Sequence, residues 1–91
     1  MKKSIKFNGT IINTPEYQCA IVKIPKSVIR NQKEAEDSYE TFKPLFKFLP
    51  LVFMSTDQGI PHALYGEEEA VRFVSQYPHK LIVWGEFEKD I

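Results

Sequence analysis

The amino-acid sequence predicts one α+β domain over residues 1–91, arranged as a two-layer sandwich of ββαββαβ order. Its 91 residues suffice for one hydrophobic core and two layers of secondary structure. Hydrophobic residues make up 43% of the chain and aromatic residues 13%, which excludes a disordered segment of low hydrophobicity. Short stretches rich in Val, Ile and Phe alternate with two segments of helical periodicity, and this succession indicates strands and helices in one chain.

The N-terminal part predicts a β-hairpin over residues 4–24. The stretch "SIKFNGTII" alternates polar and apolar residues, with Asn8-Gly9 as a tight turn or a bulge. A turn follows at residues 13–17, where Pro15 restricts the backbone. The next stretch, "QCAIVKIP", is apolar on both faces, which is typical of a central strand.

Two segments have the periodicity of amphipathic helices. The first lies within residues 27–44 and ends near Pro44, because proline disfavours the helical conformation in the residue before it. The second covers residues 67–78 and ends at Pro78. Its apolar residues follow the helical repeat at Ala70, Phe73, Val74 and Tyr77. We expect both helices to pack mainly on one face of the sheet.

Three further strands complete the predicted order. Residues 51–55, "LVFMS", read as a buried strand, and residues 56–61 as a hairpin loop. Residues 62–66 form a short return strand, and the last strand covers residues 80–89. In the last strand, alternation places one set of side chains opposite to another, namely Val83, Gly85 and Phe87 against Trp84, Glu86 and Glu88.

Residues 18–88 alone have the βαββαβ order of the ferredoxin-like split βαβ unit, here with an extra N-terminal strand. That fold places its second strand at a sheet edge, yet "LVFM" is apolar on both faces and edge strands are usually charged or interrupted. The alternative is a mixed sheet with "LVFM" inside and "HALYG" at the edge. Its succession of strand, hairpin and helix resembles the C-terminal half of thioredoxin-like folds, without their redox motif.

Charge is balanced overall and divided along the chain. Twelve basic and twelve acidic residues give a net charge of zero, which argues against a dedicated nucleic-acid-binding protein. Residues 1–33 carry seven basic residues against one acidic residue, whereas residues 34–69 carry eight acidic residues against two basic ones. Such a division indicates a polar partner surface or merely solvated faces.

The cysteine count, the N-terminus and the length of the apolar runs argue against several classes of protein. The single cysteine, Cys19, has no partner for an intramolecular disulfide, and no Cys/His cluster has zinc-ligand spacing. The N-terminus lacks the apolar region of a signal peptide, and the longest apolar run has seven residues, too few to span a membrane. We therefore expect a cytoplasmic protein that needs no cofactor or metal and binds neither nucleic acid nor membrane.

Ser55, Asp57 and His62 are the residue types of a hydrolase triad and lie within eight positions. No Gly-x-Ser-x-Gly motif surrounds Ser55. The competing interpretation is turn chemistry, in which Asp57 accepts hydrogen bonds from backbone N–H groups of its own loop. The three glutamates that follow, Glu67–Glu69, fit the first turn of a helix, where carboxylates are favourable.

Tyr65 and Trp84 complete the candidate site. A large aromatic side chain on a polar sheet face is typical of a binding or dimer surface, and the alternative is that helices cover Trp84 as part of the core. We predict a small noncatalytic binding or protein-interaction module with Asp57, His62, Tyr65 and Trp84 at its site, able to form a homodimer through a sheet face or edge strand. The alternative function is a small enzyme or redox-inactive thioredoxin-like protein with a groove near Asp57, His62 and Tyr65.

Overall fold

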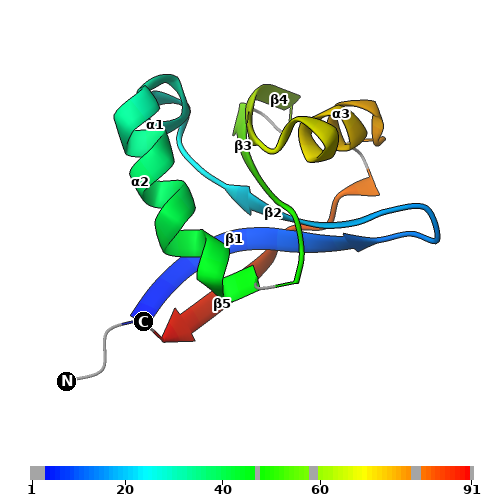
Figure 1. Ribbon diagram of the computed structural model, residues 1–91, viewed down its shortest axis with the longest axis horizontal. Coiled ribbons are helices and arrows are strands. Elements are labelled where there is room, and N and C mark those ends of the chain that lie inside the picture. The colour runs from blue at the N-terminus through cyan, green and yellow to red at the C-terminus, as the bar shows by residue number, and fades with distance from the viewer. Residues whose placement is uncertain (1–3, 47, 58–59, 79–80, 91) are drawn as a thin grey trace.

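A computed structural model describes residues 4–46, 48–57, 60–78 and 81–90, with only the backbone at 5, 56, 57, 60–62, 89 and 90 (Figure 1). Its strands are β1 (Ser4–Asn13), β2 (Gln18–Lys23), β3 (Leu51–Asp57), β4 (Ile60–Gly66) and β5 (Gly85–Asp90). Its helices are α1 (Lys26–Arg30), α2 (Gln32–Phe42) and α3 (Glu68–Gln76), with a 3-10 turn η1 (Lys43–Phe46). The predicted α+β class and the ββαββαβ order are confirmed, with the first helical segment divided into α1 and α2 at Asn31.

The sheet has five strands in the order β4-β3-β2-β1-β5. β2 and β3 run parallel, and the other neighbouring strands are antiparallel. β3 therefore lies inside the sheet and β4 at its edge, as the apolarity of "LVFM" indicates. This order differs from that of a ferredoxin-like split βαβ unit and agrees with the alternative, a mixed sheet.

The parallel pair β2 and β3 forms the core of the protein because its side chains are buried on both faces. Eight residues of β2 and β3 are at most 1% exposed. Four of them point to one face, Ala20, Val22, Leu51 and Phe53. The other four point to the opposite face, Cys19, Ile21, Val52 and Met54. Each face must therefore be covered by another element.

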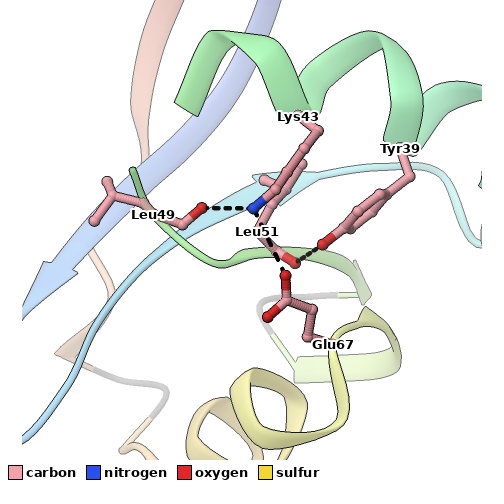
Figure 2. A network of polar contacts seen from close by, with 5 residues as sticks. All are labelled: Tyr39, Lys43, Leu49, Leu51 and Glu67. Carbon is pink, nitrogen blue, oxygen red and sulfur yellow. Dashed lines mark hydrogen bonds and ion pairs between the residues drawn. The ribbon is translucent and has the colours of Figure 1, made fainter. Parts of the chain in front are cut away.

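The two long helices cover opposite faces of the sheet. Phe42 of α2 and Phe46 of η1 pack on the first face, and Ala70 and Val74 of α3 pack on the second. In Figure 2, the green ribbon of α2 and the yellow ribbon of α3 lie on opposite sides of β3. The expectation that both helices lie mainly on one face is wrong, because a strand pair that is apolar on both faces would leave its second face in water.

Both sheet edges carry features that discourage pairing with another strand. β5 begins at Gly85, five residues later than predicted, and exposes Glu86 and Glu88. β4 contains Pro61, which has no backbone N–H to donate. Charged residues and proline on edge strands oppose strand-to-strand association.

A small polar network joins α2 to the starts of β3 and α3 (Figure 2). The Tyr39 hydroxyl donates to the Leu51 carbonyl at 3.1 Å. The Lys43 ammonium donates to the Leu49 carbonyl at 3.0 Å and lies 3.7 Å from the Glu67 carboxylate. The two bonds to backbone carbonyls each stabilise the fold by about 1 kcal/mol, whereas the partly exposed ion pair adds little.

Within the residues that the structure describes, no helix is both long and apolar enough to cross a membrane.

Gly66, at the end of β4, allows the edge strand to approach β3 closely. A Cβ atom there would lie 2.5 Å from the Leu51 carbonyl oxygen, and the φ angle of +158° is rare for other residues. Leu51 belongs to β3, whose backbone is held by strands on both sides. We expect Gly66→Ala to lower the free energy of unfolding by about 2–3 kcal/mol, measured by urea denaturation.

Gly85→Ala is the matched control for Gly66→Ala. A Cβ atom at Gly85 would meet first the Phe87 ring, at an ordinary contact distance of 3.4 Å. We expect this variant to keep the stability of the parent protein. An equal loss of stability in both variants would contradict the close approach at Gly66.

Candidate functional site

The structure places Tyr65 and Trp84 on opposite faces of the sheet. The Tyr65 ring lies 5.7 Å from the Tyr39 ring and 6.2 Å from the Phe53 ring, on the face covered by α2. Trp84 packs against the core on the face covered by α3 and is partly exposed. The two residues therefore do not share one surface, and the packing of Trp84 agrees with the alternative in which helices cover it.

Asp57 and His62 lie in β3 and β4 by their backbones, on either side of the β3–β4 turn. Their side chains lie outside the described part of the structure. The side chain of Ser55 is described, and it sits where the pairing of β3 with β4 shifts register between Ser55 and Thr56. A bulge of this kind changes the direction of a side chain and is frequent next to functional sites.

A hollow of about 270 Å³ lies near the carboxyl ends of the parallel strands β2 and β3. Its described lining residues are Asn8, Lys23, Ile24, Pro25, Lys26 and Ser55. The Ile24 N–H donates to the Met54 carbonyl at 3.0 Å, which extends the parallel pairing by one residue past β2. Pro25 then ends the extended chain, because it fixes φ and lacks an N–H, and α1 begins at Lys26.

The hydroxyl of Ser55 is the most unusual group of the hollow. Ser55 is 3% exposed, and its Oγ has no hydrogen-bond partner among the described residues. A buried hydroxyl without a partner costs about 1–3 kcal/mol. Ser55 is also one of the residues that line the hollow, although its Oγ is itself buried.

The charged residues among the described lining of the hollow are both basic. Lys23 and Lys26 line it, and no carboxylate occurs among its described lining residues. The Lys23 ammonium lies 5.9 Å from the centroid of the Trp84 ring, within the range of a cation–π contact. Trp84, predicted from the sequence, therefore contacts Lys23, a lining residue, and is not itself among the described lining residues.

Asn8, Lys23 and Lys26 are site residues that the sequence patterns do not predict. The pattern predicts a turn or bulge at Asn8, whereas this residue lies inside the continuous strand β1. The available signal was the basic excess of residues 1–33, because five of the six described lining residues come from that segment.

A second hollow, of about 250 Å³, lies at the edge formed by β1 and β5 and mixes charges of both signs. Lys6, Glu86, Phe87 and Glu88 line it. Glu88 already accepts a hydrogen bond of 2.9 Å from the Ser4 hydroxyl. This hollow lacks the orphaned buried group that distinguishes the first one.

The described residues contain no group of three or more His, Cys, Asp or Glu side chains that could hold a metal ion. They do expose four large apolar side chains, Ile11, Phe48, Leu81 and Val83. The homodimer through a sheet face or edge strand stays a prediction.

Comparisons with protein-family models, with curated proteins and with solved structures gave no match to this chain.

Cys19 is unsuited to act as a nucleophile. It is 0% exposed between Ile12, Val52 and the other residues of the α3-side core, and burial raises the pKa of its thiol to about 11. The thiolate is the reactive form, so a buried neutral thiol is inert.

We expect iodoacetamide at pH 8 to label Cys19 only as fast as the protein unfolds, monitored by mass spectrometry. Rapid labelling of the folded protein would contradict this.

The unpartnered hydroxyl of Ser55 leads us to predict that its removal stabilises the protein. Ser55→Ala removes a buried polar group that has no partner in the described chain, so we expect the free energy of unfolding to rise by about 1 kcal/mol. Thr14→Val is the contrasting variant, because the Thr14 hydroxyl donates to the Tyr17 carbonyl and accepts from the Tyr17 N–H. The free energy of unfolding of Thr14→Val should fall by about 1 kcal/mol. Destabilisation by Ser55→Ala would show that Ser55 has a partner within the protein.

Proposed function

We propose that this protein is a small noncatalytic binding module that takes its ligand in the hollow near the carboxyl ends of β2 and β3. The observation that carries the proposal is Ser55, a lining residue of the hollow whose buried hydroxyl has no partner among the described residues. Native proteins rarely leave such a group unsatisfied, and functional sites are where the exceptions occur.

The position of the hollow supports a binding role. In open sheets with parallel strands, ligands bind in the crevice outside the carboxyl ends of those strands. β2, α1, α2 and β3 form one such parallel unit, in which α1 follows directly after the hollow. The binding residues would come from the strand ends and from the first helical residue, while the core pair holds them in place.

Among the described lining residues, the chemistry favours binding over catalysis. A serine nucleophile needs a neighbouring base that accepts its proton. The Ser55 hydroxyl has no hydrogen-bond partner in the described chain, and the two lysines of the hollow carry donors only. These groups can orient a ligand, and none of them is placed to activate another.

Amide chemical-shift mapping tests this function with the full chain. We expect at least one member of a mixed set of small anionic, neutral and cationic compounds to shift the backbone amides of Asn8, Lys23, Lys26 and Ser55. Shifts confined to other parts of the protein, or no shifts with any compound at millimolar concentration, would refute the proposal.

Asn8→Phe provides the blocking variant for the same experiment. Asn8 is exposed on β1 at the rim of the hollow, and strands accept aromatic residues, so the variant should fold and obstruct the hollow. Asn13→Phe is the matched control, since Asn13 is also an exposed asparagine of β1 and does not line the hollow. Only Asn8→Phe should abolish the amide shifts.

A further inference from the structure

We infer that the hollow recognises a compact oxyanion, a phosphate or carboxylate group of a small ligand, held by Lys23 and Lys26 together with Asn8. This inference rests on the proposed function and adds to it the chemical class of the ligand.

The first argument is the balance of charge in the hollow. Two lysines line it without a carboxylate among the described lining residues, and neither lysine is ion-paired within the described part of the chain. Five of the six lining residues come from residues 1–33, where basic residues outnumber acidic ones seven to one. The protein has no net charge, so the excess of basic residues among the described lining of the hollow is local and does not extend over the whole surface.

The second argument is the kind of hydrogen bond that the lining offers. A lysine ammonium has three donors and no acceptor, and an asparagine amide carries two donors beside its acceptor oxygen. A ligand that binds both ammonium groups and the amide N–H groups must therefore present several acceptors close together. An oxyanion does so, and its bonds to ammonium groups are charge-assisted and stronger than neutral ones.

The third argument is size. At about 270 Å³ the hollow is slightly smaller than typical ligand pockets, which measure about 300–1,000 Å³. It accepts a small ligand or one terminal group of a larger one. The start of α3 is no competing anion site, because Glu67, Glu68 and Glu69 lie there and repel negative charge.

Lys23 also connects the hollow to a spectroscopic reporter. Its ammonium lies over the ring of Trp84, the single tryptophan of the sequence. An anion in the hollow competes with the indole for this ammonium, because a direct charge contact is stronger than an exposed cation–π contact. Binding should therefore change the fluorescence of Trp84.

The test is a titration of the full chain with sodium phosphate and with sodium acetate, at constant ionic strength set by sodium chloride. Trp84 fluorescence and the amide shifts of Asn8, Lys23, Lys26 and Ser55 are followed together. Both anions should saturate these signals, and the tighter one identifies phosphate or carboxylate as the preferred group. Ethylammonium chloride and ethylene glycol, as cationic and neutral probes, should leave the signals unchanged.

Variants assign the effect to the hollow. Lys23→Gln and Lys26→Gln should each weaken anion binding about tenfold, the effect of losing one hydrogen bond to a charged group. Because Lys23→Gln also removes the contact to Trp84, its binding is read from the amide shifts. Lys33→Gln is the matched control, because it removes the same charge from an exposed position on α2 and should bind like the parent.

The outcomes separate this inference from the proposed function. If the cationic or neutral probe shifts the same amides and the anions do not, the hollow binds a ligand and the oxyanion inference is wrong. If no probe shifts these amides, both fail. If Lys33→Gln weakens binding as much as Lys23→Gln, the effect is general attraction and the inference falls. If a single-stranded oligonucleotide binds the hollow far more tightly than phosphate, the ligand is a nucleic acid and the small-ligand class is wrong.

Discussion

The parallel pairing of β2 with β3 is the constraint on which the rest of the structure depends. Both strands are apolar on both faces, so the pair is stable only when each face is covered. α2 and η1 cover one face, and α3 covers the other. The connection between two parallel strands must cross from one end of the sheet to the other, and α1 and α2 provide that crossover.

The candidate site is a consequence of the same pairing. Where the parallel pair ends, Pro25 turns the chain into α1 and the register of β3 with β4 shifts beside Ser55. Ser55, Lys23 and Lys26 are among the residues that line the hollow at this place. The well-packed core holds the strand ends in position.

Charge is arranged separately from this core. The basic first third of the chain supplies β1, β2 and α1, and it therefore supplies most of the hollow. The acidic middle third places Glu68 and Glu69 in the first turn of α3 and Glu67 beside Lys43. The basic part of the sequence thus supplies the two lysines that line the hollow. The acidic part places carboxylates at the start of α3, where the helix dipole favours them.

The sequence by itself determined the α+β class and the order of the elements, and its apolarity favoured the interior position of β3. These follow from local periodicity, from proline positions and from the apolarity of short stretches. Only the tertiary structure decided that α2 and α3 lie on opposite faces, that Tyr65 and Trp84 are separated, and that Asn8, Lys23, Lys26 and Ser55 meet. The reason is physical: periodicity reports which side chains of one element share a face, whereas the neighbours of a strand end depend on pairing between segments that are distant in sequence.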